Sequence, residues 1–307
     1  MIKHIPVLLK EVIENWITNP SGFYVDCTFG EGGHTKELLR HLDSDSKVLG
    51  IDIDPMTVET GRELEKQDSR FTYLNTNYTN LSSYISSNGL PKADGILFDL
   101  GFSTAQLGDP KRSFSYNNAS STLELKYGLE GTSVYEILNE YSEGKLSSIF
   151  RNYGQIREHR QLASLLVLSR KKEPIVNVQQ LKELVEGSKI FSPRRNKNPL
   201  KLIFQALRIE CNNELNNFSR ALEKASKLLV SGGRLLVITF QSLEDELLLD
   251  WKKKVGQTLK IPDLGLVLSP LFSLRVGGVI LPTRQEIELN WASRSAKLWA
   301  FTKEREE

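Results

Sequence analysis

Short apolar segments alternate with helical patterns along the N-terminal third of this chain. The apolar segments have the length of buried strands, and they cover residues 23–27, 48–52, 71–74 and 95–99. Helical patterns begin in the gaps, near residues 35, 56 and 79. Alternation of this kind builds βαβ units, whose parallel strands are covered by helices on both faces of the sheet. The sequence therefore predicts an α/β fold around a parallel sheet.

The alternation stops after Asp99 and resumes near residue 214. Helical patterns without a convincing strand fill the interval, at residues 134–141, 146–153, 161–170 and 178–185. Beyond them we expect a helix at 214–229, a turn at 231–233, a strand at 234–239, and an antiparallel closing pair formed by 264–268 and 296–302. The simplest organisation is a discontinuous α/β domain, residues 1–107 and 206–307, interrupted by a helical domain at 108–205.

Bulk composition excludes several classes of protein. The 307 residues are 39% hydrophobic and 25% charged, and no apolar run approaches the roughly 20 residues that a membrane helix needs. Charged residues interrupt the first apolar run, which argues against a secretory signal. Cys27 and Cys211 are too few for a disulfide framework or a thiolate metal site, and the histidines are scattered. We expect a cytoplasmic protein that binds no membrane and no metal.

A glycine-rich turn follows the first predicted strand. Asp26 ends that strand, Gly30, Gly32 and Gly33 follow it, and Asp52 ends the next strand. Glycine lets the backbone turn tightly and approach a ligand where a Cβ would clash, and a carboxylate after the second strand accepts hydrogen bonds from ribose hydroxyls. This spacing is typical of a nucleotide-cofactor pocket.

The identity of the residue at position 35 distinguishes between two cofactors that such a pocket could hold. A dinucleotide fingerprint beginning at Gly30 requires glycine or alanine there, and the chain has Thr35. S-adenosylmethionine has no pyrophosphate and tolerates a looser turn, with Asp26 near its amino group and Asp52 on its ribose. The residues favour S-adenosylmethionine, and a purely structural strand-to-helix turn is the remaining alternative.

Asp99 ends the fourth predicted strand. Ligands of open parallel sheets bind beyond the carboxyl ends of the strands, so we expect Asp99 in the same crevice as Gly32 and Asp52. A hydrogen-bond acceptor held against an exocyclic amine localises the nitrogen lone pair as it attacks a methyl group. Asp99 is therefore the candidate catalytic residue, and the alternative is that it only caps a turn.

Motifs spread over nearly the whole chain carry a more specific resemblance. They cover residues 4–9, 26–34, 52–55, 94–101, 106–107, 114–115, 204–209, 231–235, 242–245 and 294–298. In this order they are similar to the bacterial small-subunit (16S) ribosomal RNA cytosine-N4 methyltransferases, the RsmH/MraW family. The resemblance implies a class I (Rossmann-like) S-adenosylmethionine-dependent methyltransferase fold with an inserted all-helical domain. It also implies that the acceptor is a cytidine in the decoding region of the RNA.

Site residues and partners follow from the same resemblance. Carried over by position, the S-adenosyl-L-methionine contacts are Gly32, Gly33, His34, Asp52, Tyr78, Asp99 and Gln106. Tyr78 stands where family members commonly have phenylalanine, and either ring can stack on adenine. Ribosomal RNA or the small ribosomal subunit is the implied partner, and the inserted domain is its implied recognition element.

Five residues on the implied substrate side depart from the family pattern, namely Glu124, Lys126, Asn198, Leu202 and Gln241. Lys126 replaces an arginine, and an ammonium group lacks the planar fork with which arginine grips a phosphate or a base. Asn198 and Gln241 each replace a histidine, and Leu202 replaces an arginine. These departures bear on the acceptor and leave the cofactor loop unchanged.

Clusters of basic residues are the candidates for contact with RNA. They are Lys111-Arg112, Lys171-Lys172, Arg194-Arg195-Asn196-Lys197 and Lys201. With a net charge of only +2, the chain must meet RNA through such local surfaces. Tyr116 is a candidate stacking platform for an unstacked base. The alternatives are a solvated basic face and simple hydrophobic packing.

Three hypotheses of function remain open from the sequence. The first is an RNA cytosine-N4 methyltransferase in which Asp99 orients the amine. The second keeps the fold and cofactor and changes the RNA or amine acceptor. The third is a non-catalytic, ribosome-binding relative. The sequence leaves open the target nucleotide, the choice between naked RNA and assembled subunit, and the oligomeric state, a homodimer included.

Overall fold

The computed structural model describes residues 5–103, 106, 122–191, 198–261, 266–274 and 278–305. The chain divides into two compact units. The first comprises Met1–Gly101 and Leu215–Glu307, and the second comprises Phe102–Glu214. The domain limits expected from the sequence, after residues 107 and 205, stay a prediction.

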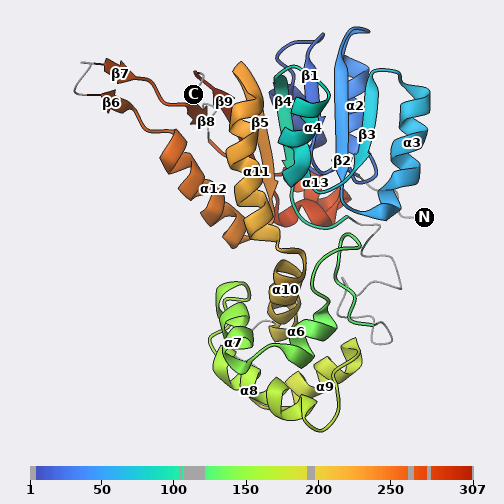
Figure 1. The fold of residues 1–307 in the computed structure, drawn as a ribbon, viewed down its shortest axis with the longest axis vertical. Helices are drawn as coiled ribbons and strands as arrows, with labels where there is room; N and C mark the ends of the chain where they lie inside the picture. Colours follow the sequence, from blue (N-terminus) through green and yellow to red (C-terminus); the bar gives the residue numbers. More distant parts are fainter. Residues whose placement is uncertain are drawn as a thin grey trace. The chain divides into compact units, whose positions relative to one another are not determined.

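A seven-stranded sheet forms the centre of the first unit (Figure 1). Its strands, in spatial order, are β3 (Phe71–Asn75), β2 (Lys47–Asp52), β1 (Phe23–Asp26), β4 (Ala93–Asp99), β5 (Leu229–Thr239), β9 (Lys297–Lys303) and β8 (Phe272–Leu274). The first five are parallel, and β9 pairs antiparallel with both β5 and β8. The strand order reverses between β1 and β4, and open α/β sheets bind ligands at such a switch point.

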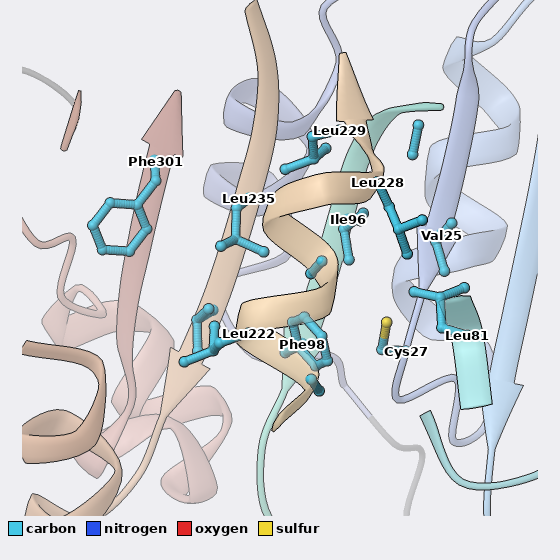
Figure 2. Close-up of a cluster of buried hydrophobic side chains, with 14 of the residues drawn as sticks. Val25, Cys27, Leu81, Ile96, Phe98, Leu222, Leu228, Leu229, Leu235 and Phe301 are labelled. Carbon is cyan, nitrogen blue, oxygen red and sulfur yellow. The ribbon is translucent and has the colours of Figure 1, made fainter. Parts of the chain in front are cut away.

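Helices cover both faces of this sheet. One face carries α1 (Leu9–Trp16), α2 (Gly33–His41) and α3 (Val58–Gln67), and the other carries α4 (Leu81–Ser87), α11 (Glu214–Leu228) and α12 (Ser242–Val255). The central strands β1, β2, β4, β5 and β9 contribute side chains to both clusters because successive side chains point to opposite faces. Figure 2 shows Leu222 and Leu228 of α11 gathered with Ile96 and Phe98 of β4 in one of these clusters. Two-sided burial explains why the strands read as continuous apolar runs.

The second unit has a hydrophobic core of its own. Its helices are α6 (Val134–Glu140), α7 (Glu143–Asn152), α8 (His159–Arg170), α9 (Val178–Gly187) and α10 (Pro199–Asn212). Four of them begin at a serine or asparagine side chain that accepts a backbone N–H: Ser133, Ser142, Asn177 and Asn198. Ile137, Phe150 and Ile203 are fully buried in the core that these helices share. The α/β fold and the helical character of the insertion are thus confirmed.

Two details of the predicted sheet are wrong. Residues 231–233 do not form a turn that precedes the strand; they lie inside β5. They form a bulge there, where Gly232 has a φ of 80° and the register with β4 shifts between Ala93 and Gly95. The run at 264–268 does not pair with the last strand. Instead β7 (Leu266–Leu268) pairs with β6 (Leu259–Ile261) in a separate two-stranded sheet. The last strand has apolar residues on both faces, so it is buried between β5 and β8.

Candidate functional site

Three aspartates end three neighbouring parallel strands. Asp26 ends β1, Asp52 ends β2 and Asp99 ends β4, so the three lie at the carboxyl edge of the sheet. Burial raises the pKa of Asp26 and of Asp52 to about 6. Burial, followed by the charges of Asp26 and Glu244, raises the pKa of Asp99 to about 8. A group of buried carboxyls with raised pKa values suits a cationic ligand, whose charge would stabilise their ionised forms.

The glycine turn between β1 and α2 adopts left-handed backbone conformations. Gly30 has a φ of 55° and Gly32 has a φ of 74°. A Cβ on Gly32 would lie 2.6 Å from the Phe29 ring, whereas a Cβ on Gly30 would meet nothing closer than 3.9 Å. Gly33 is equally constrained, since its Cβ would lie 2.2 Å from the Pro6 ring. The turn therefore requires glycine for its shape, and at Gly30 its backbone is open to a ligand.

Two threonines fix Asp26 and join it to Asp99. The Thr35 hydroxyl donates to Asp26 Oδ2 at 2.7 Å, and the Thr28 backbone N–H donates to Asp26 Oδ1 at 3.1 Å. The Thr28 hydroxyl oxygen accepts the Asp99 backbone N–H at 2.7 Å. Sequence reasoning used Thr35 only against a dinucleotide and missed both hydroxyl roles. The available signal was the position of Thr35 in the first turn of α2, directly after the strand that Asp26 ends.

Asp52 shapes the glycine turn. Its Oδ2 accepts the Gly30 backbone N–H at 2.7 Å, and its Oδ1 accepts the Asp54 backbone N–H at 2.8 Å. Each carboxylate oxygen has a second lone pair, so both can still accept a ligand hydroxyl. The structural and the ligand-binding interpretations of Asp52 are therefore compatible.

His34 is oriented by the backbone. Its Nε2 donates to the Val7 carbonyl at 3.0 Å, because a carbonyl can only accept. Its Nδ1 lies 3.7 Å from Asp99 Oδ2, which is beyond hydrogen-bond distance. The ring is buried beside the start of α2. His34 thus lies beside the glycine turn, with its ring near Asp99.

Asp99 has a buried oxygen without a partner. Among the described residues, no group donates a hydrogen bond to its Oδ1, while its side chain as a whole remains 23% exposed. An unpaired buried acceptor is costly unless a ligand supplies the donor. This oxygen is the clearest sign that the carboxyl edge of β4 is built for a ligand.

Tyr78 and Gln106 complete the set of predicted site residues. Tyr78 follows β3, and its ring meets Phe98 edge-on with a centroid separation of 5.5 Å. Gln106 belongs to the second unit, where its Oε1 accepts the Ser103 backbone N–H at 2.8 Å. The first unit therefore brings together Gly32, Gly33, His34, Asp52 and Asp99, with Tyr78 at the end of the neighbouring strand.

Several residues that depart from the family pattern have local structural roles. The Asn198 side chain accepts the Lys201 N–H at 3.2 Å at the start of α10, and Leu202 packs against the core of the second unit. The Glu124 side chain accepts the Lys126 N–H at 3.0 Å. Gln241 precedes α12 and donates from Nε2 to a Glu244 carboxylate oxygen at 2.8 Å.

Part of the predicted RNA surface is described and part is not. Lys171, Lys172 and Lys201 are exposed on the second unit. The Lys111-Arg112 pair, the cluster from Arg194 to Lys197 and Tyr116 lie outside the described residues.

No group of three or more His, Cys, Asp or Glu side chains in the described ranges could hold a metal ion. No helix in those ranges is long and apolar enough to cross a membrane.

Comparison with known proteins settles the family. The family model described as "MraW methylase family" matches residues 1–304. The chain belongs to the MraW methylase family. Among curated relatives, this MraW-family chain is 38% identical over 305 residues to ribosomal RNA small subunit methyltransferase H of Caldicellulosiruptor saccharolyticus, covering 97% of this chain and 98% of the relative. It is 36% identical over 301 residues to the protein of that name from Fusobacterium nucleatum, covering 96% and 95%.

Solved structures were compared as well. A structure of an rRNA methylase from Streptococcus thermophilus gives a TM-score of 0.41 at 12% identity, covering 97% of this chain and 94% of that one. The matched span of the family model contains every predicted site residue of this MraW-family chain. With the family shown and the sheet described above, the expected methyltransferase fold with a helical insertion is confirmed.

Proposed function

We propose that this protein transfers a methyl group from S-adenosylmethionine to the exocyclic N4 amine of a cytidine in the decoding region of small-subunit ribosomal RNA. Membership of a methylase family and two relatives named ribosomal RNA small subunit methyltransferase H support the reaction and the RNA. The observation that carries the chemistry is the buried Oδ1 of Asp99 at the carboxyl edge of β4, which has no partner in the part of the chain that the structure describes.

The residues at the crevice fit the cofactor. S-adenosylmethionine carries positive charge on its sulfonium and ammonium groups, and Asp26 and Asp99 are buried carboxyls whose ionised forms such charges stabilise. The open backbone at Gly30 admits a ligand, and Asp52 retains lone pairs for ribose hydroxyls. When bound, the cofactor supplies a methyl group on a sulfonium sulfur. We assign its contacts to Gly32, Gly33, His34, Asp52, Tyr78, Asp99 and Gln106.

Asp99 is the proposed catalytic residue. Its Oδ1 accepts a hydrogen bond from the N4 amine, which localises the nitrogen lone pair and aims it at the methyl carbon. A nitrogen–carbon bond forms as the carbon–sulfur bond breaks, and that bonding pair stays on sulfur. The alkylated nitrogen then carries one excess proton, which passes to Asp99 or to water. Positioning supplies most of the rate enhancement in this scheme.

The cysteines favour nitrogen over carbon as the acceptor atom. Methylation of a pyrimidine ring carbon needs a nucleophile, typically a thiolate, to activate the ring. Cys27 and Cys211 are the only cysteines of the chain, and both are buried. Burial raises the pKa of Cys211 to about 12 and that of Cys27 well above its usual value. Neither supplies a thiolate near neutral pH, whereas an exocyclic amine needs none.

The helical unit is the proposed recognition element for the RNA, in the cytoplasm where ribosomal subunits are assembled. Its described basic residues Lys171, Lys172 and Lys201 are exposed and available to phosphates. Structured RNA would be recognised through its shape and backbone, with the target base unstacked into the crevice beside Asp99.

Nucleoside analysis tests the proposed function. Small-subunit RNA from cells with and without the gene is digested to nucleosides and compared by mass spectrometry. Loss of N4-methylcytidine in the deletion strain, restored by the wild-type gene, supports the proposal. An unchanged nucleoside profile refutes it.

A further inference from the structure

A pocket of the first unit lies beyond the end of β5, outside the cofactor residues. Its volume is about 490 Å³, within the range of small-molecule sites. It is lined by Phe240 and Gln241 before α12, by Leu281 and Ile287 around α13 (Arg284–Leu289), by Arg294 in the short 3-10 helix that precedes β9, and by Lys297 at the start of β9. Two motifs that the cofactor site does not use, at 242–245 and 294–298, meet at this pocket. The cavity therefore needs an explanation of its own.

The pocket adjoins the side of Asp99 that faces away from the glycine turn. In the sheet, β4 lies between β1 and β5, and Asp99 pairs with Ile238, two residues before Phe240. A Cβ on Gly101 would lie 3.5 Å from the Phe240 ring. Because β9 is antiparallel to β5, its first residue Lys297 lies opposite Thr239 at the same edge. An acceptor strand that reaches Asp99 from this side must pass over the pocket.

Charge at the pocket favours an anion. Asp245 is its one acidic lining residue, and its carboxylate is already engaged by Lys297 at 2.5 Å and by the Thr239 hydroxyl at 2.6 Å. Arg294 is exposed, and within the part of the chain that the structure describes it pairs with no carboxylate. One positive charge is therefore left over, on the residue best suited to grip a phosphate.

An aromatic ring accompanies this charge. The Arg294 guanidinium lies over the Trp291 ring, 4.4 Å from its centroid. Trp291 is nevertheless 67% exposed, which is unusual for so large an apolar side chain. Beside them, the Gln241 Oε1 atom is a buried acceptor with no hydrogen-bond partner among the described residues. An arginine on an exposed tryptophan beside a cavity is a combination with which proteins bind single-stranded nucleic acid.

We propose that this pocket binds a nucleotide of single-stranded RNA flanking the methylated residue. Arg294 holds its phosphate, the open part of the Trp291 ring stacks with a base, and Gln241 Oε1 accepts a hydrogen bond from a sugar hydroxyl or a base amine. The assignment rests on the proposed function for its choice of RNA. The acceptor RNA would then be recognised by two regions of the protein: the helical unit and this pocket on the first unit.

Four variants of the full chain test the assignment. The probe is a fluorescein-labelled oligocytidylate of about ten nucleotides, titrated in the presence of S-adenosylhomocysteine and followed by anisotropy. Arg294→Ala should weaken binding about tenfold. It should also lower the magnitude of the slope of log affinity against log salt concentration by about one, because one fewer counterion is released from the RNA. Trp291→Ala should weaken binding about tenfold, and Trp291→Phe should restore most of it because the ring is retained. Leu289→Ala, at a residue of α13 that is 71% exposed, is the matched control and should bind as wild type.

Two further measurements distinguish loss of an RNA contact from misfolding of the variants. S-adenosylhomocysteine affinity by calorimetry should be equal in all variants, which shows that each is folded. In methylation of small subunits, Arg294→Ala and Trp291→Ala should raise KM for the subunit and leave kcat unchanged. Wild-type affinity and KM in both alanine variants overturn the pocket assignment, and so does a wild-type protein that does not bind the oligonucleotide. A wild type that binds it through these residues but methylates no small-subunit RNA overturns the proposed function alone.

Discussion

At the scale of single residues, Asp99 has the most unusual environment in the first unit. One of its oxygens is buried with no hydrogen-bond partner among the described residues, Asp26 and Glu244 lie close enough to oppose its ionisation, and burial removes the carboxyl from water. The resulting pKa of about 8 leaves the carboxyl largely protonated at neutral pH. A nearby cation reverses this balance. At neutral pH, a bound positively charged ligand therefore shifts Asp99 toward the ionised form.

The pH dependence of stability follows from this raised pKa. A carboxyl whose pKa is higher in the folded protein contributes stability that is present below about pH 4 and lost as the pH rises through about 8. We expect the free energy of unfolding of the ligand-free protein to fall between about pH 6 and pH 9, by up to about 1.4 kcal/mol per pH unit for this one proton.

Asp99→Asn is the matched control for this prediction. It removes the titrating group and preserves the shape, so the difference in unfolding free energy between wild type and variant isolates Asp99. Urea unfolding at several pH values measures it. Asp26 and Asp52 are present in both proteins, and their pKa values lie lower, at about 6, so the comparison centres on Asp99. A wild type whose stability relative to Asp99→Asn does not change between pH 6 and 9 contradicts the environment described for Asp99.

Proton release on cofactor binding is a second consequence at this scale. The sulfonium and ammonium charges of S-adenosylmethionine should lower the pKa of Asp99 and of Asp26, so binding near pH 7.5 should release protons, up to about one from Asp99. S-adenosylhomocysteine lacks the sulfonium charge and should release fewer. Calorimetric titrations in buffers with different ionisation enthalpies count these protons. Equal counts for the two ligands would argue against close approach of the sulfonium to Asp99.

At the scale of elements, the glycines of the turn between β1 and α2 determine its backbone shape, and we propose that this backbone contacts the cofactor. Gly30 and Gly32 share a left-handed backbone, yet only Gly32 is also closed by a neighbouring ring, that of Phe29. Phe29 in turn stacks on Phe71 with a centroid separation of 5.3 Å, so it cannot easily move. A side chain at Gly30 would therefore meet backbone strain alone, whereas a side chain at Gly32 would also clash with the Phe29 ring.

Alanine substitutions at these glycines should differ in size. Gly30→Ala adds backbone strain alone and should cost about 1 kcal/mol of stability. Gly32→Ala adds a clash at 2.6 Å with the Phe29 ring and should cost about 2–4 kcal/mol and weaken S-adenosylhomocysteine binding at least tenfold. Urea unfolding and calorimetry measure the two effects. Equal stability losses would show that the ring moves aside.

Sequence reasoning found the elements whose pattern is local. The parallel strands β1 to β4 and most helices of the second unit were predicted because apolar period and length suffice to define them. The position of β9 between β5 and β8 was missed, since strand partners far apart in the sequence are not encoded by either strand alone. The bulge at Gly232 was mistaken for a turn because a pair of glycines occurs in turns and in β-bulges alike.

The candidate site was predicted in part for the same reason. Asp52 and Asp99 end predicted strands, so the sequence placed them at one edge. The hydroxyl contacts of Thr28 and Thr35, and the unpaired oxygen of Asp99, depend on how β1, α2 and β4 meet in space. The pocket at Arg294 was likewise not predicted, since residues 240–245, 281–287 and 294–297 line it together only in the folded chain.

At the scale of the whole molecule, the chain holds two units with separate hydrophobic cores. The core of the second unit draws on α6 to α10 and on residues before them, all within Phe102–Glu214. Four of these helices, α6, α7, α9 and α10, begin at side-chain caps that need no partner from the first unit. A domain of this size can bury enough apolar surface to fold independently.

The second unit should therefore fold when it is produced alone. A fragment spanning residues 102–214 should show helical circular dichroism and a cooperative thermal transition. The fragment with Phe150→Ala, which removes a fully buried ring, should lose about 3–5 kcal/mol and serves as a control for cooperativity. A fragment without a cooperative transition would mean that this unit depends on the first.

The central claim is that Asp99 directs methyl transfer to a cytidine amine of small-subunit RNA. The most direct measurement uses purified protein, S-adenosylmethionine and small subunits from cells lacking the gene, followed by quantification of N4-methylcytidine. Wild type should form the nucleoside, and Asp99→Asn should form it at least about 100-fold more slowly, although it remains folded. Full-rate formation by Asp99→Asn, or no N4-methylcytidine with wild type, would contradict the account.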